Sequence, residues 1–306
     1  MPALVASVVI VSWNTRALLM SCLNSLASGW SGGTLQVVVV DNASSDGSLD
    51  MVKAEHPEAV VIQMGANAGY AKAINRGLQE CTGDFVCLLN SDTEMTPGAL
   101  AAMIDYLHSH PEAGLVGPAL LNPDGSHQSS RRKFPFFWAS LTWIAERGAE
   151  IKPPAEPTKA DWLVGACLVL PRQLLQRLGG MDETFPFYGE DMELAYRVRL
   201  EGLAVVQVPA ARVRHVGEGS SRSGVNPTMR VRSYYEAPLR FLRKHGSAAE
   251  LIVWRLGRGT VAAARYATAR WLRHGADAER QMTLWAGVVR LCVAGVPSEW
   301  SLGSNL

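Results

Sequence analysis

Short apolar segments alternate with amphipathic segments through residues 1–120 of the chain. A short and nearly continuous apolar segment predicts a β-strand that is buried on both faces of a parallel sheet. We expect four such strands, at Val8–Val11, Gln36–Val40, Val60–Gln63 and Phe85–Leu89.

The segments between these strands repeat apolar residues every three or four positions, which predicts helices. They are Leu18–Leu26, Gly69–Leu78 and Gly98–Leu107, the last after a Thr96-Pro97 start signal. Alternation of strand and helix is typical of an α/β protein whose parallel sheet has right-handed crossovers. In such sheets ligands bind at the carboxyl ends of the strands.

Residues 122–160 lose this alternation and are rich in turn residues, so we expect a loop region over the sheet. After it the pattern predicts two strands and two helices, at Trp162–Leu170, Arg172–Leu178, Glu190–Glu201 and Val205–Val208. A Gly/Ser-rich stretch, Gly217–Gly224, then leads into a mostly helical tail without internal repeats.

Composition excludes several classes of protein. With 306 residues, 48% of them hydrophobic and 19% charged, the chain is globular and not disordered. Its five cysteines are odd in number and lack CxxC spacing, so neither a disulfide framework nor a zinc knuckle is indicated, and a reducing cytosol fits. We expect neither a signal peptide nor a membrane-spanning segment.

The net charge of +1 conceals an asymmetry between the two parts of the chain. Residues 1–211 carry 14 basic and 22 acidic side chains, whereas residues 212–306 carry 15 and 6. A basic tail suggests an anionic partner, either a membrane surface or a phosphate-bearing ligand. Tryptophan and arginine interleave over residues 247–296, which fits a helical segment in a membrane interface or a helical cap on the rest of the protein.

Polar clusters follow the predicted strands. Helix capping accounts for Ser45 and Asp46 after the second strand but not for Asp41, so we favour a ligand contact for Asp41. The segment Asn67–Tyr70 follows the third strand and, taken alone, is more typical of a turn.

A third cluster, Asn90-Ser91-Asp92, follows the fourth strand. A carboxylate at the tip of a buried strand can hold a hard divalent cation that also takes the oxygens of a diphosphate. The alternative is that Asp92 only shapes the next turn. His215 is a candidate second ligand through its neutral imidazole if Asp92 lies nearby.

The acidic pair Glu190-Asp191 opens a predicted helix after the aromatic segment Phe185–Gly189. Acidic residues at a helix N-terminus are ordinarily partners of the helix dipole. Apolar neighbours also tune the proton affinity of a carboxylate, so this approach suits a general base held beside a sugar.

In their order along the chain, seven segments resemble the family 2 inverting glycosyltransferases of the GT-A fold, and among them the rhamnosyltransferase-like branch. The resemblance covers residues 5–220, and each motif is weak alone while the ordered set is specific. The matching segments are Ser7–Thr15, Val38–Ser48, Asn67–Gly77, Asp84–Glu94, Val116–Gly125, Leu163–Pro171 and Phe185–Gly202.

The resemblance implies a GT-A (Rossmann-like) mixed, mainly parallel sheet flanked by helices, with a helical C-terminal extension. It also implies that Asp191 is the general base, that Glu190 supports the acceptor, and that Asp92 and His215 hold Mg²⁺ or Mn²⁺. The residues that it assigns to the nucleotide-sugar are Ser12, Asn14, Asp41, Asn67, Lys72, Asn90, Ser91 and Asp92.

Two departures from the family pattern matter. Asn90 places an amide where DxD proteins have their first carboxylate, which weakens the case for a metal. The segment Gln128–Arg132 lacks the tryptophan of a QxxRW motif, which favours a transferase that adds one sugar over a processive synthase.

The activity implied by the resemblance is transfer of rhamnose from dTDP-rhamnose to a glycan or polyprenyl-diphosphate-linked acceptor, in bacterial surface-polysaccharide and cell-wall assembly. A UDP-hexose donor is the alternative. A nucleotidyltransferase is disfavoured because Val9–Thr15 lacks a Gly/Arg-rich phosphate loop, and a non-catalytic binding module because it needs no base such as Asp191.

The resemblance also implies a domain organisation and a cellular location for the protein. We expect a catalytic domain over residues 1–225, with the nucleotide-sugar part at 1–120 and the acceptor part at 121–225, and a basic helical extension over 226–306. We expect a cytoplasmic protein, peripheral at the inner face of the membrane through its tail, with a homodimer as a further role of that tail and no nucleic-acid partner.

Overall fold

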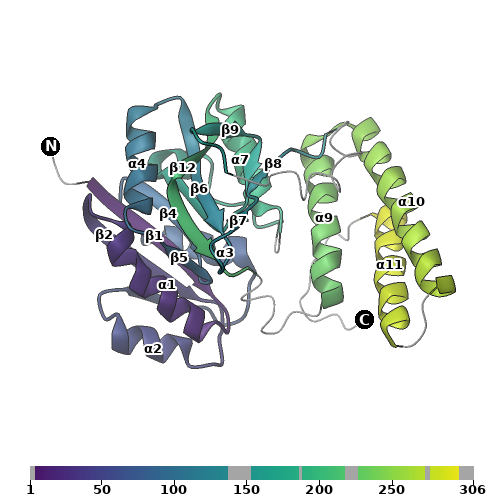
Figure 1. Ribbon diagram of the computed structural model, residues 1–306, viewed down its shortest axis with the longest axis horizontal. Helices are drawn as coiled ribbons and strands as arrows, with labels where there is room; N and C mark the ends of the chain where they lie inside the picture. The colour runs from purple at the N-terminus through teal and green to yellow at the C-terminus, as the bar shows by residue number, and fades with distance from the viewer. Residues whose placement is uncertain (1–3, 137–152, 186–187, 218–226, 273–275, 296–306) are drawn as a thin grey trace. The chain divides into compact units, whose positions relative to one another are not determined.

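The computed structural model describes residues 4–136, 153–185, 188–217, 227–272 and 276–295 (Figure 1). The chain divides into two compact units. The first consists of residues 1–133, 146–184 and 190–224, and the second of residues 134–145, 185–189 and 225–306.

The first unit begins with strands and helices in alternation. Its elements up to residue 121 are β1 (Leu4–Ser12), α1 (Arg16–Gly29), β2 (Gly33–Asp41), α2 (Ser48–Glu55), β3 (Val60–Gln63), α3 (Tyr70–Leu78), β4 (Phe85–Asn90), β5 (Thr93–Met95), α4 (Ala99–Ser109) and β6 (Ala113–Leu121). The later elements are β7 (His127–Gln128), β8 (Arg131–Arg132), β9 (Thr158–Ala160), β10 (Trp162–Leu163), β11 (Cys167–Pro171), α6 (Arg172–Arg177), α7 (Glu190–Leu200) and β12 (Ala204–His215).

One mixed sheet organises this unit, in the order β3-β2-β1-β4-β11-β6-β12-β5, with β7 beside β6 and β9 beside β12. Strands β1 to β4 are parallel, and β12 is parallel to β6. Strand β11 runs antiparallel between β4 and β6. The predicted α/β class with a mixed, mainly parallel sheet is therefore confirmed.

Helices cover both faces of this sheet, as the alternation of side chains along β1 shows. Val8 and Ile10 belong to a core shared with α1, α2 and α4, whereas Val9 and Val11 belong to a core shared with α3, α6 and α7. Both sets are buried. A strand buried on both faces has no polar alternation, which explains why β1 reads as a continuous apolar segment.

Three expectations about strands need correction. Val60 of β3 is 37% exposed because β3 is the edge strand, so it is not buried on both faces. The predicted strand Trp162–Leu170 is two strands, β10 and β11, because the chain turns at Gly165. The strand predicted at Val205–Val208 continues to His215 because β12 also pairs with β5.

The predicted loop region at 122–160 contains the short strands β7, β8 and β9, and its residues 137–152 lie outside the described part. Most of the Gly/Ser-rich stretch, residues 218–224, also lies outside it.

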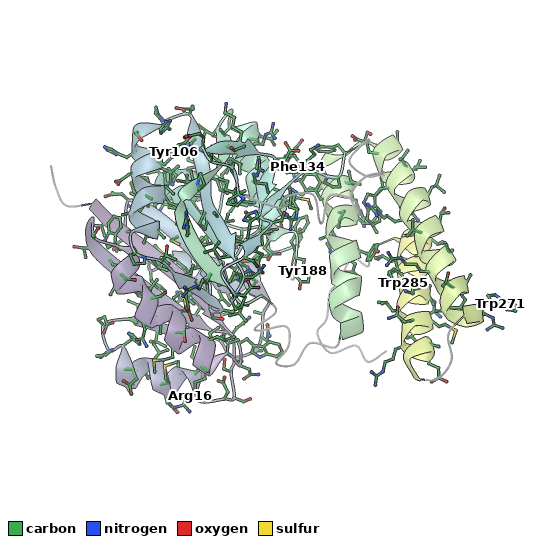
Figure 2. All side chains as sticks on the ribbon, viewed as in Figure 1. Arg16, Tyr106, Phe134, Tyr188, Trp271 and Trp285 are labelled. Atoms are coloured by element: carbon green, nitrogen blue, oxygen red, sulfur yellow. The ribbon has the colours of Figure 1, made fainter. Side chains whose placement is uncertain are left out.

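The second unit is helical, as predicted for the tail, with α9 (Pro227–His245), α10 (Ala248–Leu272) and α11 (Ala276–Ala294). Trp254 of α10 is buried, and the Arg265 guanidinium lies 4.7 Å from the ring centre of Trp285 on α11. Phe134 stacks on Phe241 of α9 with ring centres 5.4 Å apart, and Trp271 projects outward from the end of α10 (Figure 2). Among the described residues, no helix has the length and apolar character needed to span a membrane.

Candidate active site

Two loops at the carboxyl ends of β1 and β2 are joined by hydrogen bonds. Asn14 has a left-handed backbone (φ 53°), and its Oδ1 accepts from the Ser45 N–H at 2.8 Å. The Asn14 N–H donates to Ser44 Oγ at 3.0 Å, and the Arg16 N–H donates to Asp46 Oδ2 at 2.8 Å. Asn14 therefore holds the loop after β1 to the loop after β2.

Asp41 ends β2 and is only 2% exposed. One carboxylate oxygen, Oδ2, accepts from the Ser44 N–H at 3.1 Å. The other, Oδ1, is buried and has no hydrogen-bond partner among the described residues. A buried carboxylate oxygen without a donor is costly, so this atom is suited to receive an N–H or O–H of a ligand.

Asn67 and Lys72 lie in different surroundings. Asn67 Oδ1 accepts from Asn42 Nδ2 at 2.9 Å and from the Gly69 N–H at 3.1 Å, so it holds the turn before α3. Lys72 is exposed on α3. The turn that the sequence favours for Asn67–Tyr70 is therefore present.

A chain of three buried hydroxyls links β1 to β4. Ser12 Oγ lies 3.0 Å from Thr15 Oγ1, which lies 2.9 Å from Ser91 Oγ. Asn90 is fixed through its backbone, because its N–H donates to the Ala166 carbonyl oxygen at 2.9 Å. Ser12, Asn90 and Ser91 are therefore brought to one edge of the sheet, together with Asp41, which pairs with Ser12 in the β1–β2 register.

Asp92 and His215 meet at the ends of two strands far apart in the sequence. The Val216 N–H donates to the Asp92 carbonyl oxygen at 3.0 Å. His215 Nε2 lies 3.4 Å from Asp92 Oδ1, and the two side chains are 12% and 7% exposed. The condition placed on His215, that Asp92 lies nearby, is met.

These two side chains fit a divalent cation. A carboxylate oxygen and an imidazole nitrogen are both ligands of Mn²⁺, and Mg²⁺ is commonly bound by one or two carboxylates plus substrate phosphates. Within the described residues, no third His, Cys, Asp or Glu completes a metal-binding group. The remaining ligands would therefore come from a diphosphate and water.

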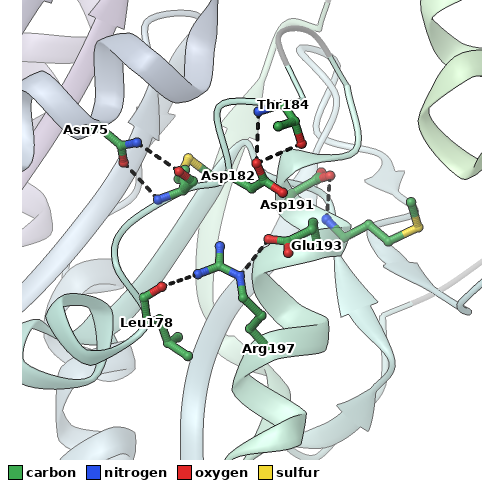
Figure 3. A network of polar contacts seen from close by, with 9 residues as sticks. Asn75, Leu178, Asp182, Thr184, Asp191, Glu193 and Arg197 are labelled. Carbon is green, nitrogen blue, oxygen red and sulfur yellow. Dashed lines mark hydrogen bonds and ion pairs between the residues drawn. The ribbon is translucent and has the colours of Figure 1, made fainter. Parts of the chain in front are cut away.

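Asp191 stands at the start of α7, where its carboxylate accepts two backbone hydrogen bonds, one of which is drawn in Figure 3. Its Oδ2 accepts from the Gly165 N–H at 2.9 Å, and its Oδ1 accepts from the Met192 N–H at 2.8 Å. Gly165 is next to Ala166, which bonds Asn90 at the end of β4. A short hydrogen-bonded path therefore connects Asp191 to the segment that carries Asp92.

Burial dominates the electrostatics of the acidic pair. Burial, together with the nearby charge of Asp191, raises the pKa of Glu190 from 4.5 to about 8. Burial also raises the pKa of Asp191, against the opposing effect of its backbone donors and of Arg132. A raised pKa makes Asp191 a stronger base than an exposed aspartate.

Helix α7 is anchored by a buried ion pair. Glu193 is fully buried, and its Oε2 lies 2.7 Å from Arg197 Nε. Arg197 Nη1 donates to the Leu178 carbonyl oxygen at 2.6 Å, and Asn75 of α3 bonds the Met181 backbone through both its amide atoms (Figure 3). The Arg197–Leu178 bond thus ties α7 to the segment before it, and Asn75 ties that segment to α3.

The aromatic segment before Glu190 is only partly described. Phe185, Tyr188 and Gly189 belong to the second unit, and residues 186–187 lie outside the described part. The expectation that this aromatic segment holds the acidic pair beside a sugar therefore stays a prediction.

Sequence reasoning missed Gly165, Thr15 and Gln128. A Cβ on Gly165 would lie 3.0 Å from Asp191 Cβ, so any side chain at this position would require Asp191 to shift. The only local signal was a glycine inside an apolar segment, which indicates a turn or a close backbone approach. Gln128 contacts His215 across 87 positions of sequence, and no local pattern reports such a pair.

Solved structures share this architecture. A mannosyltransferase from Pyrobaculum calidifontis, solved with GDP-Man and Mn²⁺, aligns with a TM-score of 0.60 and 20% identity, over 94% of this chain and 86% of that one. The fold is therefore that of the GT-A glycosyltransferases, with a helical C-terminal region.

Sequence comparison identifies the family within this class. The profile of Glycosyl transferase family 2 matches residues 7–179. An N-acetylglucosaminyl-diphospho-decaprenol L-rhamnosyltransferase of Mycobacterium tuberculosis is 31% identical over 232 residues, which are 68% of this chain and 74% of the relative. A pre-mycofactocin glycosyltransferase of the same species is 30% identical over 184 residues, 59% of this chain and 37% of the relative.

The chain belongs to glycosyl transferase family 2. The predicted family, fold and enzyme class are confirmed, and the nucleotidyltransferase and binding-module alternatives are left without support.

Proposed function

We propose that this protein transfers a sugar from a pyrimidine nucleotide-sugar, with dTDP-rhamnose as the first candidate donor, to a lipid-linked or glycan acceptor by one inverting displacement. The observation that carries this proposal is the placement of Asp191, which Gly165 connects to the strand end bearing Asp92. A carboxylate base near a diphosphate-binding edge is the arrangement that a single displacement needs.

Asp41 supports a pyrimidine donor. Its buried Oδ1 would accept the ring N–H that uracil and thymine share, and the loops around Asn14 would frame the nucleoside. This chemistry does not separate dTDP from UDP, so a UDP-hexose remains the second candidate donor. The rhamnose preference rests on the relative from Mycobacterium tuberculosis, whose name specifies an L-rhamnosyltransferase.

Asp92 and His215 would hold Mg²⁺ or Mn²⁺. When bound, the cation supplies positive charge that stabilises the departing nucleoside diphosphate. Asn90 and Ser91 are placed at the same strand end, where they would contact the diphosphate or the sugar.

Asp191 would remove the proton of the acceptor hydroxyl as that oxygen attacks the anomeric carbon. The bond from that carbon to the diphosphate breaks on the opposite face, so the configuration inverts. Glu190, with its raised pKa, is protonated at neutral pH and would donate a hydrogen bond to the acceptor. Its Oε2 is buried without a partner among the described residues, which leaves it available for that contact.

The acceptor proposed here is a polyprenyl-diphosphate-linked glycan in bacterial surface-polysaccharide and cell-wall assembly, since the rhamnosyltransferase relative is named for a diphospho-decaprenol acceptor. We place the catalytic domain at residues 1–225 and the protein in the cytoplasm, at the inner face of the membrane.

Helix α10 would make the membrane contact. Ile252, Leu256 and Trp271 of this helix are 54%, 67% and 75% exposed. A basic helix with exposed apolar side chains suits the interface of anionic lipids. Co-sedimentation of the wild type and of Leu256→Glu with anionic vesicles tests this contact, and the variant should bind the vesicles more weakly. If the tail forms a dimer instead, the molecular mass in solution should be twice that of the chain.

The central experiment combines donor, metal and base. Purified protein is incubated with a panel of dTDP- and UDP-sugars plus Mn²⁺ or Mg²⁺, and nucleoside diphosphate release is followed beside Asp191→Asn. Turnover of one donor only with metal and only with Asp191 supports the proposal. Absence of any reaction with extracted lipid acceptors, or full activity of Asp191→Asn, contradicts it.

A further inference from the structure

Gln128 is held in a fixed orientation beside the candidate cation site. It ends β7, where its backbone pairs with Leu120 of β6. Its amide nitrogen donates to Asn122 Oδ1 at 3.0 Å and to the His215 carbonyl oxygen at 3.2 Å. Because both amide hydrogens point to carbonyl oxygens, the amide oxygen Oε1 is the atom that faces the imidazole, 2.7 Å from His215 Nδ1.

This contact determines where neutral His215 carries its proton. An amide oxygen only accepts hydrogen bonds, so His215 Nδ1 must be the protonated nitrogen. The lone pair is then on Nε2, which is the atom 3.4 Å from Asp92 Oδ1. The hydrogen bond made by one ring nitrogen decides which nitrogen can bind a metal.

We propose that Gln128 is a positioning residue that holds His215 in its Nδ1–H tautomer and thereby turns the Nε2 lone pair toward a divalent cation shared with Asp92. The inference rests on the proposed metal role of Asp92 and His215. It also assigns a role to Gln128, the first residue of the segment that lacks the tryptophan of the QxxRW motif.

The tautomer can be measured without metal or substrate. Nitrogen-15 chemical shifts of the histidine ring, recorded above the ordinary pKa range of histidine, distinguish Nδ1–H from Nε2–H. We expect Nδ1–H for His215 in the wild type and a shift toward Nε2–H in Gln128→Leu. An Nε2–H signal in the wild type, or an unchanged signal in Gln128→Leu, overturns the inference.

Cation affinity provides the second readout, by electron paramagnetic resonance titration of Mn²⁺ in the presence of UDP. Loss of an outer-shell partner typically weakens metal binding about 10- to 100-fold, and we expect this loss in Gln128→Leu. Gln128→Glu keeps an acceptor for Nδ1–H but loses both donated hydrogen bonds. We therefore expect Gln128→Glu to keep the Nδ1–H signal and to bind Mn²⁺ much more tightly than Gln128→Leu.

The two variants separate positioning from simple support of the loop. If Gln128→Glu binds Mn²⁺ as weakly as Gln128→Leu, Gln128 acts only through its donated hydrogen bonds and the inference fails. If wild type and Gln128→Leu bind Mn²⁺ equally, the inference alone fails. If the wild type binds no Mn²⁺ with UDP, the proposed metal role fails and the inference falls with it.

Discussion

Substitution of Gly165 by alanine tests whether the placement of Asp191 governs the reaction. The Cβ of an alanine would lie 3.0 Å from Asp191 Cβ and 3.2 Å from Asp191 Oδ2, closer than ordinary van der Waals contact of 3.4 Å or more. The carboxylate must therefore move by a few tenths of an ångström, which disturbs the 2.9 Å hydrogen bond from the residue 165 N–H.

The size of the effect follows from this displacement. A general base contributes about 10²- to 10⁴-fold to a rate, and a misplacement of about 1 Å can cost about 100-fold. A shift of a few tenths of an ångström should therefore lower kcat about 10-fold, which is about 1.4 kcal/mol in the activation free energy. The donor KM should stay unchanged, since Asp41 and its loops lie on other strands.

The assay is the initial rate of nucleoside diphosphate release at saturating donor, for wild type, Gly165→Ala, Asp191→Asn and the double variant. Gly65→Ala is the matched control, because no atom lies within 4 Å of a Cβ at that position. Gly165→Ala should have no further effect in the Asp191→Asn background, because both changes act on one carboxylate. A wild-type kcat for Gly165→Ala, or additive losses in the double variant, would refute the reasoning.

Three further predictions concern charge and burial. Because burial holds the pKa of Glu190 at about 8 against 4.5 in the unfolded chain, the folded protein keeps a proton that the unfolded chain releases, and its stability falls as the pH rises through this range. The Tm advantage of Glu190→Gln over wild type should therefore grow between those values, and a constant difference contradicts the pKa shift. Arg197→Met removes the ion-pair partner of fully buried Glu193 and should lower the free energy of unfolding by about 3–5 kcal/mol in a urea titration, whereas a loss below 1 kcal/mol would show that the pair is dispensable. Asp41→Asn replaces the buried acceptor with an amide and should weaken UDP binding about 10-fold or more by calorimetry, with unchanged affinity as the contrary result.

The parallel half of the fold was predictable because its strands are buried on both faces. Such strands leave continuous apolar segments in the sequence, and β1, β2 and β4 were found from them. The same pattern also predicted β3 with its observed bounds, Val60–Gln63, but its burial on both faces was wrong, because the sheet ends there and Val60 is exposed. An edge position depends on which strands pair, and the apolar pattern does not carry that information.

The places of Asp41 and Asp92 were predictable from the sequence, because Asp41 is the last residue of β2 and Asp92 lies just after β4. The sequence made His215 a candidate ligand only if Asp92 lies nearby. In the structure His215 Nε2 is 3.4 Å from Asp92 Oδ1. The contacts of Gly165 and Gln128 could not be foreseen, because each joins segments that only the complete sheet brings together. In the sequence, Gly165 is only a single glycine in an apolar segment, and Gln128 is only the start of an incomplete QxxRW motif.

The reversed strand β11 has a consequence for the order in which the protein is built. It pairs with both β4 and β6, so the sheet stays split until residues 167–171 have been synthesised. Long-range pairing of this kind is slow, because a large chain loop must close before any contact forms. The segments that carry Asp41 and Asp92 leave the ribosome well before Asp191, which gains its Gly165 partner when β11 docks. His215, the proposed second ligand of the cation, is synthesised later still, so the proposed site cannot be complete before β12 has joined the sheet.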